Sequence, residues 1–171
     1  LEAKLRNEQI IDFVRAVSPA IYRIFMRLIK LEIPDIDHFI HNSREASYDR
    51  WKFERMRESD YTVLRLFHAE STVNSSSLTE LILHLDLPES VKEEVRQLRE
   101  LEKSVRNPLA HLIKPFDEAE LYRTTGFSSQ HFMEILVDLA RFTGIVYDRE
   151  HFYFDEANRL VRALLTGEEN G

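Results

Sequence analysis

Apolar residues recur along most of this chain at steps of three and four, the spacing that places them on one face of an α-helix. The first such stripe consists of Leu5, Ile10, Val14, Val17, Ile21, Ile24, Phe25 and Leu28. Ser18-Pro19 lies inside this stripe and is a common sequence at the start of a helix, because Ser suits the N-cap and Pro suits the first helical position. The pattern therefore predicts either two helices or one kinked helix before Pro34.

The next stretch predicts two more helices and one loop. The first helix runs from Asp35 to about Glu58, and the second runs from Tyr61 to Ala69. Their apolar positions are Phe39, Trp51 and Phe53 in the first, and Val63, Leu64 and Phe67 in the second. The Ser-rich residues 71–77 predict a loop, which ends where the capping-box spacing of Ser77 and Glu80 starts a short helix through about Leu85.

The second half of the chain has clearer helix boundaries. Pro88 is followed by a second capping box, Ser90-Val91-Lys92-Glu93, and by a strong stripe: Val91, Val95, Leu98, Leu101 and Val105. Asp117 caps a short helix that Gly126 ends, and Ser128 caps the next helix, with Phe127 and Phe132 placed as a hydrophobic staple. A last helix carries Leu160, Val161, Leu164 and Leu165. The only β element that the pattern allows is one small hairpin near residues 145–154.

Composition supports a helical domain. The chain has 171 residues, a length that suits one domain, and its four Gly and five Pro are few for a turn-rich β fold. We therefore predict an all-α bundle of about seven to eight helices that occupies residues 1–166, with a flexible tail at 167–171. Because the sequence opens on Leu1 in an immediate helical rhythm, we expect it to be part of a longer protein with an N-terminal partner domain.

Several classes of protein are excluded by composition. The absence of Cys rules out disulfide scaffolds, thiolate zinc sites and cysteine nucleophiles. No apolar run approaches the roughly 20 residues that span a bilayer, so we expect a cytoplasmic protein without a membrane contact. The net charge of −7 argues against general coating of nucleic acid but leaves room for a local basic site.

The candidate chemistry lies in Arg106-Asn107-Pro108-Leu109-Ala110-His111. Pro108 removes a backbone donor and disfavours helical angles at Asn107, so we predict a helix break at 106–107 and a new helix from Pro108. On an unbroken helix, Arg106 and His111 would lie about 140° apart around the axis. With the break, Arg106 precedes a helix N-terminus, where free N–H groups favour a phosphate, and His111 lies one turn further on. The same residues also fit an ordinary helix junction with a half-buried His111.

The local charge agrees with an anion site. Between Arg96 and Lys114, five basic residues face two acidic ones, a local charge of +3. Three of them, Arg99, Lys103 and Lys114, are our candidates for additional contacts with a polyanion such as a nucleic acid.

The sequence Arg106-Asn107 followed by His111 resembles the R-x4–6-H motif of HEPN ribonucleases, in which a polar residue often follows the arginine. The long amphipathic helix before it is also similar. Among HEPN families, the chain most resembles the C-terminal HEPN domain of the CRISPR-associated type III-A accessory ribonucleases. The resemblance covers most of the chain as a helical pattern but only about six residues as a motif.

This resemblance implies a metal-independent endoribonuclease that cleaves single-stranded RNA and leaves a 2′,3′-cyclic phosphate and a 5′-OH. By position, His111 would transfer protons, Arg106 would hold the scissile phosphate, and Asn107 would orient the motif or the substrate. It implies no cofactor and no metal. It also implies a homodimer that gathers both copies of the motif in one cleft, and a cyclic oligoadenylate activator on a CARF sensor domain outside these residues.

Other constellations compete with this motif. His38 and His41, near Asp35 and Asp37, have helical spacing for a metal site but too few ligands for a structural zinc. Trp51, among Tyr48, Arg50, Lys52 and Arg55, suits either RNA stacking or a core position. His131, with Glu134 or Asp138, suits a solvated helix face. Two further functions stay open: a catalytically silent HEPN-like dimerisation or partner-binding module, and a HEPN toxin of a toxin–antitoxin pair.

Overall fold

The computed structural model describes residues 1–42, 49–111, 116–148 and 150–166, with the backbone alone for 106–111 and 153. The helices of this part are α1 (Glu2–Arg6), α2 (Ile10–Glu32), the 3-10 helix η1 (Ile36–Phe39), α3 (Phe53–Arg57), α4 (Thr62–Arg65), α5 (Ser75–His84), α6 (Glu89–His111), α7 (Glu118–Thr125), α8 (Ser129–Phe142) and α9 (Tyr153–Thr166). A two-stranded antiparallel sheet pairs β1 (Ile40–His41) with β2 (Arg50–Trp51). The predicted all-α bundle is confirmed.

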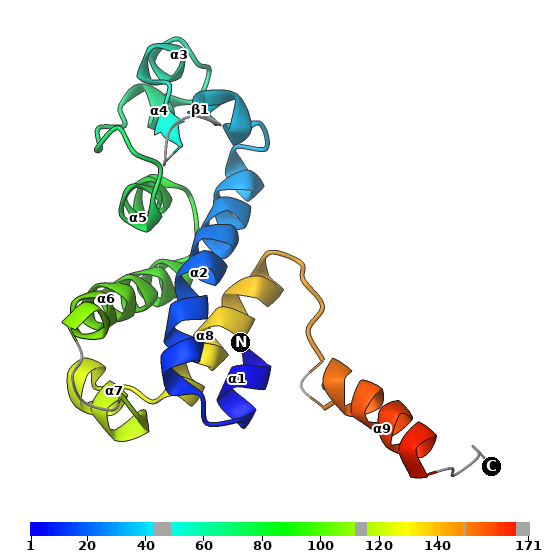
Figure 1. Cartoon of the computed structure of the whole chain (residues 1–171). Helices are drawn as coiled ribbons and strands as arrows, with labels where there is room; N and C mark the ends of the chain where they lie inside the picture. The colour runs from blue at the N-terminus through cyan, green and yellow to red at the C-terminus, as the bar shows by residue number, and fades with distance from the viewer. Residues whose placement is uncertain (43–48, 112–115, 149, 167–171) are drawn as a thin grey trace.

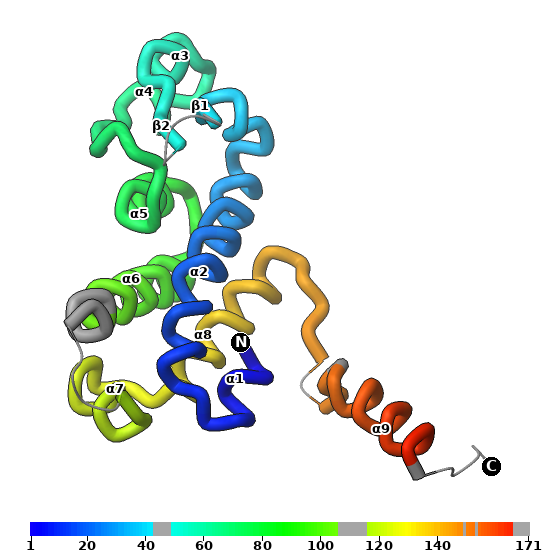
Figure 2. Tube along the Cα trace, viewed as in Figure 1, coloured from blue at the N-terminus to red at the C-terminus, as the bar shows by residue number. Residues whose placement is uncertain are grey.

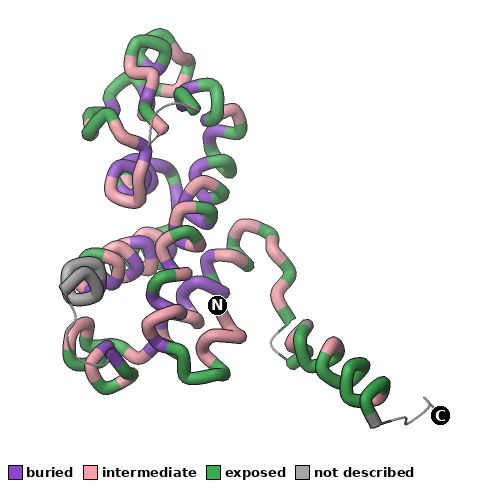
Figure 3. The backbone as a smooth tube through the Cα atoms, in the orientation of Figure 1, coloured by how far each residue is buried: buried purple, intermediate pink, exposed green. Residues whose placement is uncertain are grey.

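Helix α2 is the spine of the molecule (Figure 1). It packs against α1, α5, α6 and α8, while the sheet, α3 and α4 lie together near its C-terminal end. The predicted stripe is the reason, because its residues from Ile10 to Leu28 are buried among these neighbours. Figure 3 shows the buried backbone concentrated along α2, α5, α6 and α8.

Pro19 lies inside α2, which is one helix from Ile10 to Glu32. The Ser18-Pro19 signal left two alternatives open, and the one with two separate helices is therefore wrong. Proline removes one intrahelical hydrogen bond, but the buried residues Val17 and Ile21 hold the helix on both sides of it. Tertiary packing here outweighs the local preference for a break.

The predicted helix from Asp35 to Glu58 is wrong. The described part of this stretch contains η1, the two strands and the short α3 instead. The backbone N–H of Trp51 donates to Ser71 O at 2.9 Å, and that of Lys52 donates to Phe39 O at 2.8 Å. A local periodicity does not reveal hydrogen bonds between partners this far apart in sequence. The helix predicted at 61–69 is also shorter than expected, since α4 covers only Thr62–Arg65.

Helix α5 starts before the predicted cap at Ser77. Its N-cap is Asn74, whose side chain accepts from Ser77 N at 3.0 Å, while Ser77 Oγ accepts from Asn74 N at 3.1 Å. The capping box is real but lies three residues upstream, because Asn serves as N-cap as well as Ser does.

The predicted boundaries of α7 and α8 are confirmed. The Asp117 side chain accepts from Glu120 N at 3.0 Å, and Gly126 ends α7 with a φ of 79°. Ser128 Oγ accepts from His131 N at 3.1 Å, and the rings of Phe127 and Phe132 meet edge to face at 5.7 Å. Each of these signals lies within a few residues of its partner, so the sequence displays it in full.

The predicted hairpin at 145–154 is wrong, because the described residues of that stretch form a connection and then the start of α9. Asp148 does make a turn, since its Oδ1 accepts from Glu150 N at 2.8 Å. The flanks contact other elements instead of each other. Tyr147 donates to Glu2 of α1, and the guanidinium of Arg6 lies 4.3 Å from the ring centroid of Phe152.

Helix α9 extends away from the bundle (Figures 1 and 3). Its predicted apolar residues are exposed, most of all Leu164 at 84% and Leu165 at 82%. Within the described residues, no helix combines the length and apolar character that crossing a membrane requires.

Candidate active site

Helix α6 carries the candidate motif. Its apolar stripe is buried as predicted, at Val91, Val95, Leu98, Leu101 and Val105. These residues pack α6 against α2, α5, α7 and α8. Val105 directly precedes Arg106, so the bundle fixes the backbone up to the first residue of the motif.

Arg106, Asn107 and His111 lie in the last six residues of α6, which continues through Pro108. The predicted break at 106–107 and the new helix from Pro108 are therefore wrong. The physical reason is the one seen at Pro19, since packing on the N-terminal side holds the helix despite one lost hydrogen bond. The side chains of these three residues lie outside the described part of the chain, and so does Lys114.

The continuous helix changes the geometry of the motif. A helix C-terminus presents carbonyl groups, so the amide N–H groups expected to hold a phosphate are engaged within the helix. The positions of Asn107 and His111 lie four residues apart and share a face, whereas those of Arg106 and His111 are about 140° apart around the axis. Positive charge at this helix end must therefore come from side chains.

The positions of Arg99, Lys103 and Arg106 follow steps of four and three residues, so they align on one face of α6. The two described side chains each have an acidic partner. Arg99 Nη1 lies 3.4 Å from Glu102 Oε2, and Lys103 Nζ lies 3.6 Å from Glu100 Oε1. The predicted basic surface is thus partly neutralised within its own helix.

Sequence analysis missed the role of Glu102. Its side chain is mostly buried, and besides Arg99 it accepts a hydrogen bond from Ser75 Oγ at the start of α5. It therefore fixes Arg99 and joins α6 to α5 two turns before the end of α6. The i, i+3 spacing of Arg99 and Glu102 was the available signal.

Several ionisable residues in the N-terminal half of α6 have shifted pKa values. Hydrogen bonds from Arg96 hold the pKa of Glu89 below its ordinary value, and hydrogen bonds to Glu89 and Glu93 raise the pKa of Arg96. Burial raises the pKa of Glu94, and the nearby charge of Asp138 on α8 adds to the shift. Positive charge on this half of α6 is thus already engaged by carboxylates.

The competing histidine and tryptophan have structural surroundings. His131 is half-buried, stacks on Phe127 with ring centroids 4.6 Å apart, and lies 3.3 Å from Gln97 Oε1. It is therefore not the freely solvated residue that we expected. Trp51 is 5% exposed, packs on Phe67 and donates from Nε1 to Ser77 Oγ at 3.1 Å, which assigns it to the core. Tyr48 lies outside the described residues.

The acidic and histidine residues near η1 form simple pairs. Asp37 meets Lys30 at 2.5 Å, and His38 Nδ1 lies 3.8 Å from Asp35 Oδ2. Over the described ranges, no group of three or more His, Asp or Glu side chains could hold a metal ion. The hollows described between α1 and α8 and beside α4 are not lined by α6.

The chain is thus a helical bundle with an Arg-Asn-x3-His sequence at the end of the long helix α6. The family model described as the Cas_Csm6 HEPN domain matches residues 1–162. The chain belongs to this family, which supports a CRISPR-associated ribonuclease effector. No curated protein matches the chain.

Proposed function

We propose that this chain is a metal-independent endoribonuclease that cleaves single-stranded RNA with Arg106, Asn107 and His111. The observation that carries the proposal is the position of these residues together at the end of α6 in a chain of the Cas_Csm6 HEPN family. A domain that only packs has no need to keep Arg, Asn and His at this spacing.

The proposed reaction is an internal transfer at phosphorus. A base removes the proton of the ribose 2′-OH, and the 2′-oxygen attacks the adjacent phosphate. The bond from phosphorus to the 5′-oxygen breaks, and this oxygen takes a proton from an acid, which leaves a 2′,3′-cyclic phosphate and a 5′-OH. His111 serves in proton transfer, since imidazole titrates near neutral pH. Arg106 holds the charged phosphate through paired N–H groups, and Asn107 orients the motif or the substrate.

The helix geometry supports a site shared by two copies. On one continuous α6, the positions of Arg106 and His111 lie about 140° apart around the helix axis, so they are on different faces of a single copy. Across a two-fold axis near the end of α6, Arg106 of one chain meets His111 of the other. Such a homodimer also doubles the local basic charge of an otherwise acidic protein. Cyclic oligoadenylate control through a CARF domain outside these residues completes the proposal.

The first test is cleavage of an end-labelled single-stranded RNA in EDTA. His111→Ala should slow cleavage by about 100- to 10,000-fold, the usual contribution of acid–base catalysis. Arg106→Ala should also slow cleavage and weaken RNA binding. His131→Ala is the matched control, because this histidine contacts Gln97 and Phe127 and should leave the rate unchanged. Equal cutting by wild type and His111→Ala, or inhibition by EDTA, would contradict the proposal.

A mixing experiment tests whether the site is shared. Co-expressed Arg106→Ala and His111→Ala chains form heterodimers in which an intact arginine and an intact histidine lie on different chains. Recovered cleavage in the mixture supports pairing across the two-fold axis. Failure to recover, with both chains folded and dimeric, would show that each chain uses its own pair.

One observation favours the silent module as a second candidate. Arg99 and Lys103, the described candidates for RNA contact, already have carboxylate partners on α6. A silent module predicts that wild type and His111→Ala dimerise alike and that neither cuts RNA. A toxin would share the cleavage chemistry and differ in its protein partner.

A further inference from the structure

Glu102 of α6 is a carboxylate that the fold holds mostly out of water. Its side chain is 13% exposed, and Oε2 accepts a hydrogen bond from the hydroxyl of Ser75, the first residue of α5. Helix α5 packs beside α6 (Figure 2), and the N-terminus of a helix favours a negative charge. Such partners are required, because an uncompensated charge is costly to bury. Glu102 is therefore fixed between two helices.

Arg99 is the third member of this group of side chains. Its Nη1 atom lies 3.4 Å from Oε2 of Glu102, the same oxygen that accepts from Ser75. A guanidinium has five N–H groups, and this contact is the one polar contact that the side chain of Arg99 makes within the described residues. The side chain is also 27% exposed, so a ligand in solution can reach it. Arg99 is therefore oriented by Glu102 and still able to donate.

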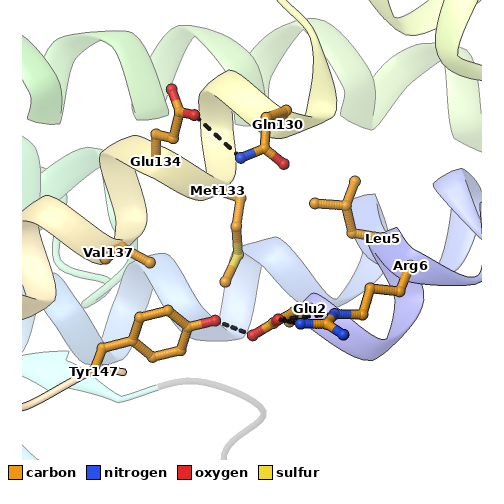
Figure 4. Close-up of a pocket in the computed structure, with 8 residues that line it drawn as sticks. All are labelled: Glu2, Leu5, Arg6, Gln130, Met133, Glu134, Val137 and Tyr147. Atoms are coloured by element: carbon orange, nitrogen blue, oxygen red, sulfur yellow. Dashed lines mark hydrogen bonds and ion pairs between the residues drawn. The ribbon is translucent and has the colours of Figure 1, made fainter. Parts of the chain in front are cut away.

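Two other arginines of the bundle are engaged more completely. Arg96, one turn earlier on α6, bonds to two carboxylates at 2.7 and 3.1 Å. Arg6 bonds to Glu2 in the hollow between α1 and α8 (Figure 4), and it also bonds to Asp155 at 3.1 Å. Arg99 has a single carboxylate at a longer distance, and that carboxylate also serves Ser75. The positive charge of Arg99 is therefore the least balanced of the three.

Arg99 lies on a face of α6 that leads to the candidate motif. Its position and that of Arg106 are seven residues apart, which is nearly two turns. They therefore lie within about 20° of each other around the axis and about 10 Å apart along it. The position of Lys103 lies between them on the same face. Basic positions in a line of this kind suit the backbone of a single nucleic-acid strand.

We infer that Arg99 is a second phosphate-binding arginine of the RNA site, and that Glu102 and Ser75 are positioning residues that hold its guanidinium in place. The inference rests on the proposed function, because it extends the proposed site from Arg106 along α6. Holding Arg99 in advance favours binding, since less side-chain freedom is then lost when RNA arrives. A strand with its scissile phosphate at Arg106 would bring a later phosphate to Arg99. The site should therefore prefer strands that extend beyond the cleaved linkage.

The test measures binding of an RNA that cannot be cut. A fluorescently labelled single-stranded RNA with 2′-O-methyl groups lacks the attacking hydroxyl, and its anisotropy gives the dissociation constant at several salt concentrations. Arg99→Ala should weaken binding about tenfold, the loss typical of a hydrogen bond to a charged group. It should also reduce the slope of log affinity against log salt by about 0.7, the share of one phosphate contact. Arg96→Ala is the matched control, because its charge is already paired, and it should leave the slope unchanged. Equal changes in both variants would overturn the inference.

Variants of Glu102 separate positioning from charge. If only charge mattered, removing this carboxylate beside a polyanion would strengthen binding. If Glu102 positions Arg99, Glu102→Ala should instead weaken binding about fivefold, because Arg99 must then be ordered when RNA binds. Glu102→Gln keeps an acceptor for Ser75 and Arg99 and should bind at least as tightly as wild type. Tighter binding by Glu102→Ala would overturn the positioning role.

Ser75→Ala tests the same role without changing any charge, and it decides the question if Glu102→Ala does not fold. It removes the hydroxyl that holds Glu102 and should weaken binding in the same direction, whereas binding equal to wild type would overturn the positioning role. The outcomes also separate this inference from the proposed function. If wild type cuts ordinary RNA but Arg99→Ala binds as wild type does, the second phosphate site is wrong and the endoribonuclease stands. If Arg99→Ala weakens binding by a wild type that does not cut, the phosphate site stands without the reaction. If wild type binds no RNA, both are wrong.

Discussion

Helices α8 and α9 are alike in length and pattern but opposite in burial. Each has 14 residues and one apolar stripe. The stripe of α8, from Phe132 to Leu139, is buried against α2 and α6, whereas Leu164 and Leu165 of α9 are among the most exposed leucines of the described chain. The comparison teaches that periodicity predicts a helix and its apolar face, but the partner of that face depends on the rest of the molecule, or on another one.

The difference starts at the helix N-termini. Helix α8 begins with the Ser128 cap, and Glu118 of α7 accepts from both the N–H and the hydroxyl of Ser129, at 2.8 and 2.6 Å. These bonds hold the first turn of α8 in the bundle. Helix α9 is joined to the bundle near its first turn, through Arg6. The first turn of α8 is therefore held by hydrogen bonds within the bundle, whereas α9 is held by the contacts of Arg6 near its first turn.

The largest expected effect is the loss of a buried leucine from α8. Leu139→Ala removes a fully buried side chain and should lower the free energy of unfolding by about 2–5 kcal/mol. Leu165→Ala makes the same change on the exposed face of α9 and should alter it by no more than about 0.5 kcal/mol. Urea unfolding at a concentration where the chain is monomeric measures both. Equal losses would mean that α9 packs on its own bundle.

A smaller effect is expected from the cap of α8. Ser128→Ala leaves the N–H of His131 without its acceptor and should lower the free energy of unfolding by about 1 kcal/mol. Helix α6 begins at Glu89, so the predicted cap at Ser90 is wrong and Ser90 is an exposed serine within the first turn. Ser90→Ala is therefore the control, and it should change the free energy of unfolding by only a few tenths of a kcal/mol. If Ser128→Ala matched this control, the cap would not be what integrates α8.

The smallest effect concerns the contact of α8 with α6. Because the pKa of Glu94 is raised in the folded chain, the fold holds this proton more tightly than the unfolded chain does. The resulting stability is present below the ordinary pKa of Glu94 and is lost as pH rises through the raised value. Glu94→Gln should therefore stabilise the chain at pH 7, by at most about 0.5 kcal/mol, and not at pH 3.

Thermal unfolding at both pH values measures this difference. Asp138→Asn should shrink it, since the charge of Asp138 contributes to the raised pKa. A stabilisation by Glu94→Gln of the same size at pH 3 and pH 7 would show that it does not come from this ionisation.

Local sequence signals were sufficient to predict the boundaries of α7 and α8. Asp117, Gly126, Ser128 and the Phe127–Phe132 staple all act within five residues, and each lies where the sequence predicts it. The sheet was predicted in the wrong place because its pairs join residues far apart, such as Ile40 with Trp51. A period of three or four residues cannot report such a contact.

The candidate site was only partly predictable for a related reason. The spacing of Arg106, Asn107 and His111 is visible in the sequence. The sequence analysis placed them at a helix N-terminus, however, whereas they lie at the C-terminal end of α6. Pro19 and Pro108 both favour a break locally, and both lie within helices of 23 residues. In each case the buried stripe before the proline outweighs one missing hydrogen bond.

The buried Trp51, which donates a hydrogen bond to Ser77, is an intrinsic fluorescent probe of one region of this protein. Trp51 is the only tryptophan, and it lies buried at the end of β2, against the capping box of α5. Its emission should shift to longer wavelength when that end of the bundle opens to water. Because α9 lies away from this region (Figure 1), the same emission should not change when α9 alone moves. One emission spectrum thus distinguishes unfolding of the bundle from a movement of α9.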